Sequence, residues 1–343
     1  MTEVVLAQQI QHCTLKTSLE VPLPPKSCTR IAPVLGAWLA IFLVACGGDS
    51  TAPQNDPRGI MLGTSGTGSA SEIFIMRPDG SGRRQLTHNT ILDNDPDWSP
   101  DGSRIVYISA VDSLPGATAR RRDVFVMNVD GSGSHRLFKA TDGPGAAHPR
   151  WSPDGTRISF DSFDLSLGGF QPFVMNADGS NVKLVRPMPG ENFSLEWSPA
   201  GTHFLFLTNR APRLLWTLYL MPVDGSSDQQ LSGNDACTSN LGRAAQWSPD
   251  GSTIAFSCET NLGSWIISLR SDGTAITPVT VPATVDFAPV WSPSGEQIAF
   301  ASDRALLGGN PIPQVYLINA EGGPVSQVTS HPVRQVVNAW RIH

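Results

Sequence analysis

The chain has 343 residues, of which 40% are hydrophobic and 16% are charged, with 32 Gly and 28 Pro. This composition is typical of a globular protein rich in turns and excludes an intrinsically disordered chain. The formal net charge is -6. Since binding to nucleic-acid phosphates needs clustered Lys and Arg, we expect no nucleic-acid partner.

The first segment of the chain is predicted to be an export signal. Residues 31–45 are uncharged and apolar, and Lys26 and Arg30 precede them. Such a run spans about 22 Å as a helix, short of the ~30 Å hydrocarbon core, so a signal peptide fits better than a membrane span. A buried core segment is the alternative. The run ends in Leu43-Val44-Ala45-Cys46, which resembles the bacterial lipobox and implies cleavage before Cys46 and lipidation of that cysteine.

Three regions follow from this interpretation: a signal peptide at 1–45, a lipidated cysteine with a flexible tether at 46–58, and a folded region at 59–343. A signal peptide usually has ~15–30 residues, so we expect the true start to lie downstream of Met1. Gly47 resembles the residue after the cysteine in outer-membrane lipoproteins. We therefore expect a lipid anchor facing the periplasm, in the outer rather than the inner membrane, with the cell surface as the alternative.

An internal repeat determines the predicted fold. Trp-Ser-Pro occurs five times, at spacings of 53, 46, 50 and 44 residues, and a sixth Trp follows 49 residues later. The repeat tryptophans are Trp98, Trp151, Trp197, Trp247, Trp291 and Trp340. Three copies read W-S-P-D-G, in which Pro followed by Asp-Gly favours a tight reversal between antiparallel strands.

Each copy continues with a short apolar run, a variable loop, a second apolar run before a Gly-containing turn, and a weaker fourth strand. The first copy shows this as 105–108, 124–127 before Asp130-Gly131, and a strand beyond it. The strands are apolar on both faces, so both faces must be covered. Four short strands per ~45 residues indicate a propeller blade, with the Trp packing between blades.

The predicted fold class is all-β: a six-bladed β-propeller whose last blade is closed by strands from both termini. Trp340 begins a unit that stops after one strand, and residues 60–64, 73–76 and 84–87 supply the three strands that this unit lacks. Joining them closes the ring and leaves no open sheet edge. A five-bladed ring with unpaired ends is the alternative.

The pattern W-S-P-D-G-x-x-I-A-F, with its later D-G and L-T segments, resembles the TolB-type (WD-repeat-like) propeller repeat over residues 59–343. The resemblance implies the propeller fold and, in part of the family, a role in the Tol–Pal system. Two differences from the TolB proteins argue against that role. The family's TolB proteins carry an α/β domain before the propeller, where this chain has only residues 47–58, and they are not lipid-anchored.

Catalytic motifs are not found. Residues 63–68 approach a G-x-S-x-G elbow without matching it, and no phosphate loop or H-E-x-x-H motif occurs. The Asp-Gly pairs recur at turn positions rather than in a calcium cage. We expect no catalytic residue, no metal and no cofactor, although a channel-bound metal ion remains an open alternative.

Propellers bind ligands where loops converge on the central channel. The residues three positions before each repeat Trp are predicted to lie there, and polar residues at or next to these positions form the candidate binding site. The candidates are Asp93, Asp95, His148, Arg243 and Asp286. They could form a polar or metal-binding pocket; the alternative is solvated loop residues or hydrogen-bond partners within the channel.

Cys237 and Cys258 flank the fourth W-S-P segment. Pairing of the two strands around residues 248–252 brings Cys258 near residues 242–244, a few residues from Cys237. In an oxidising compartment we expect a disulfide between them. Two unpaired thiols are the alternative.

The sequence therefore predicts a monomeric, non-enzymatic, lipid-anchored envelope propeller that binds a protein or an envelope polymer. A propeller enzyme of the polysaccharide lyase or hydrolase type, using polar residues at the channel mouth, is the main alternative. A lipid-anchored spacer is another. The ligand is not predictable, because specificity lies in variable loops.

Overall fold

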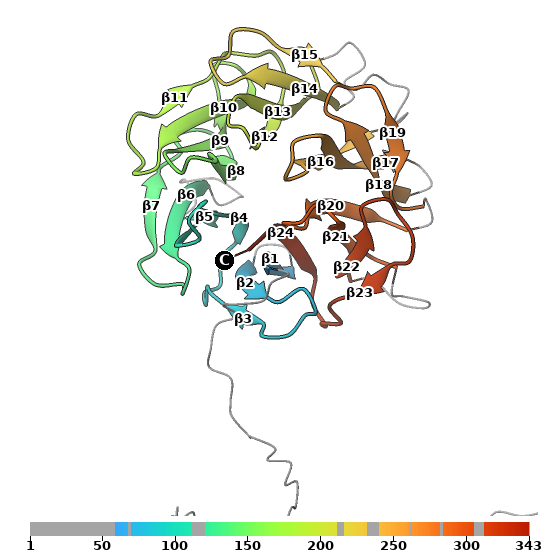
Figure 1. Ribbon diagram of the computed structural model, residues 1–343. Coiled ribbons are helices and arrows are strands. Elements are labelled where there is room, and N and C mark those ends of the chain that lie inside the picture. The colour runs from blue at the N-terminus through green and yellow to red at the C-terminus, as the bar shows by residue number, and fades with distance from the viewer. Residues whose placement is uncertain are drawn as a thin grey trace, which may run out of the picture. The chain divides into compact units, whose positions relative to one another are not determined.

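The computed structural model describes residues 59–67, 70–111, 121–210, 216–231, 240–260, 263–281, 284–304 and 312–342. They form six antiparallel sheets of four strands each, arranged in a ring around a central channel (Figure 1). This confirms the prediction of an all-β, six-bladed propeller.

The first three blades run in chain order from the N-terminal side. Blade 1 consists of β24 (Gln335–Arg341), β1 (Ile60–Thr67), β2 (Ala70–Met76) and β3 (Arg84–Gln85). Blade 2 consists of β4 (Asp93–Trp98), β5 (Arg104–Ala110), β6 (Arg122–Asn128) and β7 (His135–Phe138). Blade 3 consists of β8 (Ala146–Trp151), β9 (Arg157–Asp164), β10 (Gly169–Asn176) and β11 (Lys183–Leu184).

The remaining blades repeat the same order. Blade 4 consists of β12 (Asn192–Trp197), β13 (His203–Thr208), β14 (Thr217–Pro222) and β15 (Gln229–Gln230). Blade 5 consists of β16 (Asn240–Trp247), β17 (Thr253–Thr260), β18 (Gly263–Arg270) and β19 (Ile276–Pro278). Blade 6 consists of β20 (Asp286–Trp291), β21 (Gln297–Ser302), β22 (Gln314–Asn319) and β23 (Ser326–Gln327).

Both ends of the described propeller meet in blade 1, as predicted. Strand β24 pairs with β1 from Ile60 opposite Arg341 to Ser65 opposite Gln335. This pairing closes the ring. The five-bladed alternative is wrong, because residues 60–67 and 335–341 belong to one sheet.

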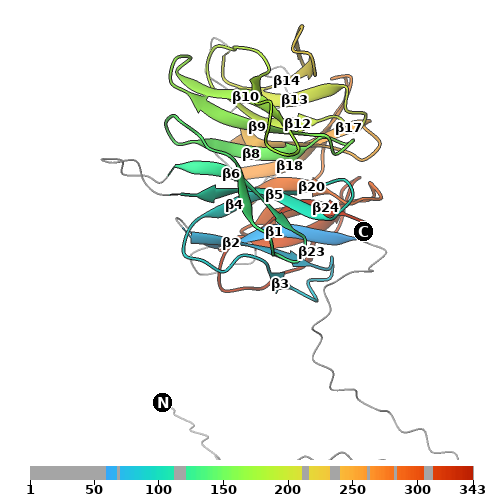
Figure 2. The ribbon, with the colours of Figure 1, turned by 90° about the vertical axis from the view of Figure 1, so that its left-hand side faces the viewer.

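The ring has two distinct faces. The inner strands β4, β8, β12, β16, β20 and β24 all begin at one face, here called the mouth face, and end at the other, the turn face, where the W-S-P turns lie. The C-terminus lies on the turn face, at the right of Figure 2. Gly59 also lies there. Its Cα is packed so closely against the backbone carbonyl of Arg341, near the C-terminus, that a Cβ on Gly59 would clash with it.

The repeated turn is a network of short hydrogen bonds that depends on its Ser, Asp and Gly. In blade 2 the Ser99 hydroxyl donates to Asp101 at 2.6 Å and accepts the Arg104 N–H at 2.9 Å. The N–H of Gly102, whose φ is 72°, donates to the Ser99 carbonyl at 2.9 Å. Only glycine adopts this conformation without strain, which explains the fixed last position of the motif.

Neighbouring blades pack through apolar side chains and through a close backbone contact. Trp98 is buried between blades 1 and 2 in a cluster with Leu62 and Ile75. Where β6 turns towards β7, a Cβ on Gly131 would lie 2.7 Å from the carbonyl oxygen of Leu86 in the preceding blade. The same glycine-to-carbonyl contact joins blade 6 to blade 1, where Gly80 faces the carbonyl of Val328. The ring is thus closed by the same contact that joins its other blades.

Arg341 completes the ring where the W-S-P-D-G turn is missing. Its guanidinium donates to the carbonyl oxygens of Ser99 and Pro100 in blade 2, the latter at 2.6 Å. In blades 2 to 5 the turn proline instead packs against the turn glycine of the following blade, as Pro100 does against Gly155. A single arginine therefore takes the place of the absent turn.

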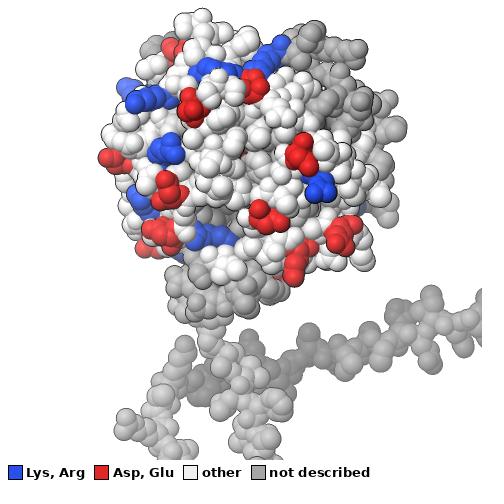
Figure 3. Space-filling model, turned by 45° about the horizontal axis from the view of Figure 1, so that its top comes forward, with Lys and Arg blue, Asp and Glu red and all other residues white. Residues whose placement is uncertain are grey.

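The predicted signal peptide, Cys46 and the tether lie outside the described residues. Across the part of the chain that is described, no helix is long and apolar enough to cross a membrane. On the face shown in Figure 3, Lys and Arg alternate with Asp and Glu, without a large patch of either sign.

Candidate functional site

The residues three positions before the repeat Trp share an unusual backbone conformation. Asp95, His148, Ser194 and Ala288 have φ values of 50°, 46°, 58° and 52°. Each lies at a β-bulge, where the register of the inner strand shifts against its neighbour. A left-handed conformation costs a non-glycine residue about 1–2 kcal/mol, and bulges redirect side chains. This unfavourable conformation is present in four blades, and in each of them the residue at the bulge lines the channel.

A cavity of ≈ 610 Å³ occupies the mouth-face half of the channel. Asp95, His148, Ser194, Ala244 and Ala288 form a ring of its lining residues, one from each of blades 2 to 6. Blade 1 contributes Thr64, Val336 and Asn338. This volume is in the range of small-molecule sites and of pockets that receive side chains of a partner.

His148 connects the cavity to a buried carboxylate. Its Nδ1 lies 2.8 Å from Asp161 Oδ2, and Asp161 is 1% exposed. Asp161 also accepts the N–H of Ser194 in blade 4 at 2.8 Å. The Asp95 carboxylate lies 3.9 Å from His148 Nε2. Burial lowers the pKa of His148, but the charge of Asp95 and the hydrogen bond to Asp161 outweigh burial and raise it overall.

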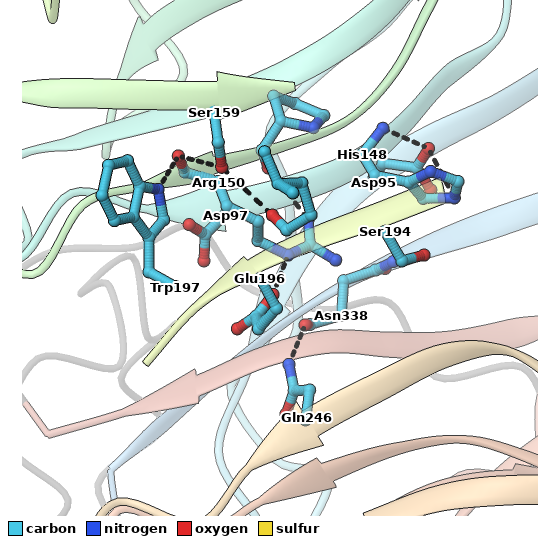
Figure 4. Close-up of polar contacts among 12 residues, drawn as sticks. Asp95, Asp97, His148, Arg150, Ser159, Ser194, Glu196, Trp197, Gln246 and Asn338 are labelled. Atoms are coloured by element: carbon cyan, nitrogen blue, oxygen red, sulfur yellow. Dashed lines mark hydrogen bonds and ion pairs between the residues drawn. The ribbon is translucent and has the colours of Figure 1, made fainter. Parts of the chain in front are cut away.

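A second charged group lies deeper in the channel (Figure 4). Arg150 Nε donates to Glu196 Oε2 at 2.9 Å, which links blade 3 to blade 4. Asp97 accepts the N–H of Trp151 at 2.8 Å. Burial raises the pKa of Asp97, and it raises that of Glu196 to about 7, although Arg150 opposes both shifts. The pKa of Glu196 therefore lies close to neutral pH.

The opposite wall at this depth is neutral. The Gln246 side chain donates to the carbonyl oxygen of Asn338 at 3.4 Å, from blade 5 to blade 1 (Figure 4). Arg150 and Asn338 line the cavity, whereas Asp97, Glu196 and Gln246 do not. These deeper side chains form the floor, and the pocket opens towards the mouth face.

Asp93 and Asp286 occupy equivalent positions, five residues before the repeat Trp, and they do not line the cavity. Both are buried in the sheet, at 1% and 0% exposure. Asp93 accepts the hydroxyl of Ser109 at 2.6 Å, and Asp286 accepts that of Ser302 at 2.6 Å. Asp286 also pairs with Arg304 at 2.6 Å. Their hydrogen bonds hold the inner strand to its neighbour.

Of the five predicted binding residues, the structure brings Asp95 and His148 together at the cavity. Arg243 belongs to β16 but lies outside the residues whose side chains are described. Cys46 and Cys237 lie outside the described residues. Cys258 is buried and disulfide-bonded, while its pairing with Cys237 stays a prediction. Among the described side chains, no group of three or more His, Cys, Asp and Glu is arranged to hold a metal ion.

Four charged residues at or beneath the cavity were missed by sequence reasoning. Asp97, Arg150 and Glu196 directly precede their repeat Trp, two positions after the predicted channel residues. A charged residue directly before three of the repeat tryptophans recurs in the sequence, and this recurrence was the available signal. Asp161 lies ten residues after Trp151, in the neighbouring strand, and nothing in the repeat marks it.

An aromatic cluster extends from the cavity to the rim of the mouth face. The His148 ring meets the Phe193 ring edge-on, with 6.0 Å between the ring centroids. The centroid of Phe193 lies 4.7 Å from that of Phe170 and 5.3 Å from that of Trp216. The hairpin between β9 and β10 lies at the same rim, and its Leu165 is 72% exposed. Apolar surface is therefore present beside the polar cavity.

Five of the eight large apolar side chains that are exposed in the described part of the chain lie on the mouth face. They are Leu165, Leu167, Val281, Val285 and Ile312. Leu165 and Leu167 belong to blade 3 and the other three to the loops of blades 5 and 6, so these side chains lie on opposite sides of the channel mouth and form an apolar rim around it. The cavity and this apolar rim share that face.

No family model matches the chain. An uncharacterised protein of Agrobacterium fabrum is 28% identical over 261 residues, which is 75% of this chain and 82% of that protein. The Tol-Pal system protein TolB of Francisella tularensis is 22% identical over 230 residues, 66% of this chain and 50% of that protein. The chain thus spans half the length of that TolB.

Solved structures agree on the fold. TolB from Acinetobacter baumannii superposes with a TM-score of 0.68 at 19% identity, over 82% of this chain and 66% of its own. A puromycin-hydrolysing peptidase of Mycobacterium tuberculosis superposes with a TM-score of 0.53 at 14% identity, over 79% of this chain and 45% of its own. Identities this low show the fold alone. The chain is a TolB-like β-propeller in fold, and its neighbours in structure include an enzyme.

Proposed function

We propose that the protein is a non-enzymatic, lipid-anchored protein of the cell envelope that binds a protein or an envelope polymer at its mouth face. The observation that carries this proposal is the placement of the cavity and the apolar rim. Both lie on the face opposite Gly59, the residue that continues the predicted tether from Cys46.

This arrangement suits a protein tethered to a bilayer. Twelve residues, 47–58, separate Cys46 from Gly59, and the extended chain between those two residues spans at most about 45 Å. Attachment through the turn face leaves the mouth face free of the tether. A partner in the aqueous compartment can then reach the cavity without displacing lipid.

The test uses photoreactive residues in intact cells. A benzophenone amino acid at Leu165 or Val281, both 72% exposed on the mouth face, should crosslink to one partner. The matched control is Val182, which is 38% exposed on the turn face and should give no such product. Equal crosslinking from both faces would contradict the proposal. Cys46→Ala should release the protein from membranes, and retention would contradict the anchor.

An enzymatic function is the second candidate, favoured by the contact between His148 Nδ1 and Asp161 at 2.8 Å. A carboxylate that orients a histidine facing a cavity is an arrangement for general acid–base catalysis, here of a polysaccharide lyase or hydrolase. Turnover of envelope or plant polysaccharides that is lost in His148→Gln would support this candidate. Absence of turnover with partner binding intact would favour the binding function.

A further inference from the structure

At two blade junctions the repeat tryptophan is covered by an arginine from the preceding blade. The guanidinium carbon of Arg104 lies 4.7 Å from the ring centroid of Trp151, and that of Arg157 lies 4.7 Å from the ring centroid of Trp197. A guanidinium is attracted to the face of an indole by a cation–π interaction, and its planar group stacks on the ring. The propeller itself therefore shows which chemical group fits over a repeat tryptophan.

Blade 5 has a threonine where blades 2 and 3 have these arginines. Arg104 and Arg157 lie six residues after the repeat Trp of their own blade, and Thr253 lies six residues after Trp247. A groove of ≈ 350 Å³ lies at this junction, on the turn face, and is lined by Thr253 and by Trp291 of blade 6. The indole that an arginine covers in blades 3 and 4 is therefore open to this groove in blade 6. The other two W-S-P blades hold His203 and Gln297 at the arginine position.

The charged residues that line the groove are both acidic. Asp250 belongs to the W-S-P-D-G turn of blade 5, and Glu321 belongs to the turn between β22 and β23 of blade 6. No Lys, Arg or His is among the described residues of its lining. Glu321 is exposed and makes no hydrogen bond or ion pair within the described part of the chain. A groove lined by charges of one sign attracts the opposite charge, so this one favours a cation.

The turn aspartate has an arginine beside it in blades 2 and 3. Hydrogen bonds from two serines, together with the charge of Arg104, lower the pKa of Asp101 to about 2. The same combination recurs in blade 3. In blade 5 the serine hydrogen bonds to Asp250 are retained and lower its pKa, but Thr253 supplies no charge. A guanidinium from outside the chain would restore the arrangement of the other two blades.

Arg270 of blade 5 does not take this place. It lies opposite Thr253 in the pairing of β17 with β18. Its side chain is absent from the lining of the groove, and its charge acts on Asp272 in the following turn. The groove is therefore left to a ligand.

We propose that the groove between blades 5 and 6 binds the guanidinium group of an arginine side chain from a second protein. The guanidinium stacks on Trp291, as the propeller's own arginines stack at the other junctions, and its N–H donors bind the carboxylates of Asp250 and Glu321. Free arginine fits less well, because its own carboxylate would lie beside two acidic residues. This site is on the turn face, separate from the cavity at the mouth, and goes beyond the proposed function.

The test measures binding of Nα-acetylarginine amide and of its neutral isostere Nα-acetylcitrulline amide to the purified protein by NMR titration. The arginine probe should bind at least tenfold more tightly. Thr253→Arg should abolish its binding, because the new side chain fills the groove as Arg104 fills the corresponding place in blade 2. Val182→Arg adds the same charge to an exposed site on the turn face of blade 3, and this matched control should bind the probe like the wild type. Glu321→Gln should weaken binding at least threefold.

Equal affinity for both probes, or undiminished binding of the arginine probe by Thr253→Arg, would overturn the inference. Tighter binding by Arg270→Ala would show that Arg270 occupies the groove and would overturn it as well. Free arginine that binds more tightly than Nα-acetylarginine amide would overturn the protein ligand in favour of the amino acid. Thermal unfolding of each variant shows that the fold is intact. Crosslinking from the mouth face does not involve this groove, so a failure here leaves the proposed function standing.

Discussion

The titration of Glu196, in the channel, should make the free energy of unfolding depend on pH. Its carboxylate pairs with Arg150 at 2.9 Å, and burial raises its pKa from 4.5 to about 7. The folded protein therefore holds this proton more tightly than the unfolded chain does. The resulting stability is fully present below pH 4.5 and is lost as the pH rises through 7. At 1.36 kcal/mol per pKa unit, this loss amounts to about 3 kcal/mol.

Glu196→Gln removes this titration, because an amide stays neutral. We expect the free energy of unfolding of the wild-type protein to fall by about 3 kcal/mol more than that of the variant between pH 4 and pH 8. Urea unfolding at closely spaced pH values measures this difference. The comparison isolates Glu196 from His148, whose raised pKa acts in the same direction. Glu321→Gln, at an exposed site, is the control. Parallel pH profiles for wild type and Glu196→Gln would refute the reasoning.

Four further predictions concern stability and covalent structure. Gly131→Ala should lower the free energy of unfolding by more than 2 kcal/mol, while Gly168→Ala, where nothing lies within 4 Å, should cost only about 1 kcal/mol; urea unfolding decides whether the two differ. Arg341→Ala removes two hydrogen bonds across the closing junction and should accelerate amide hydrogen exchange in blades 1 and 2 before the others. Asp286→Ala removes a buried carboxylate from the Ser302 hydroxyl and from the partly buried Arg304 and should cost about 3 kcal/mol, so an unchanged melting temperature would contradict its role. Thiol labelling of the unfolded protein should reach Cys258 only after reduction.

The sequence predicted the fold because each blade repeats the same local chemistry. In blades 2 to 6 the Trp packs against the neighbouring blade and the turn Ser and Gly form the same hydrogen-bonded turn, so their spacing alone identifies these units. Closure through both termini was also predictable, since the strands missing after Trp340 are present at residues 60–87. A local pattern that recurs this many times is compatible with few other folds.

The site was predicted only in part. Asp95 and His148 were identified from their distance to the repeat Trp, but the bulge that turns them towards the channel has no sequence signal, since Ala288 adopts the same conformation. Asp161 reaches His148 from the neighbouring strand, and such a contact depends on strand register. Short side chains such as Ala244, Ser257 and Ala288 line the cavity, and only the packed structure reveals the volume that they leave.

The position of β1 in blade 1 has a mechanical consequence. The strand order β24-β1-β2-β3 places the first strand of the propeller between two partners rather than at an edge. A force applied to the chain ahead of Gly59, as from an anchor in a moving membrane, would act on a strand bonded along both sides. Such a strand resists extraction more strongly than an edge strand, whose bonds can break one pair at a time. Closing the ring with both termini therefore also secures the propeller to whatever holds its N-terminal end.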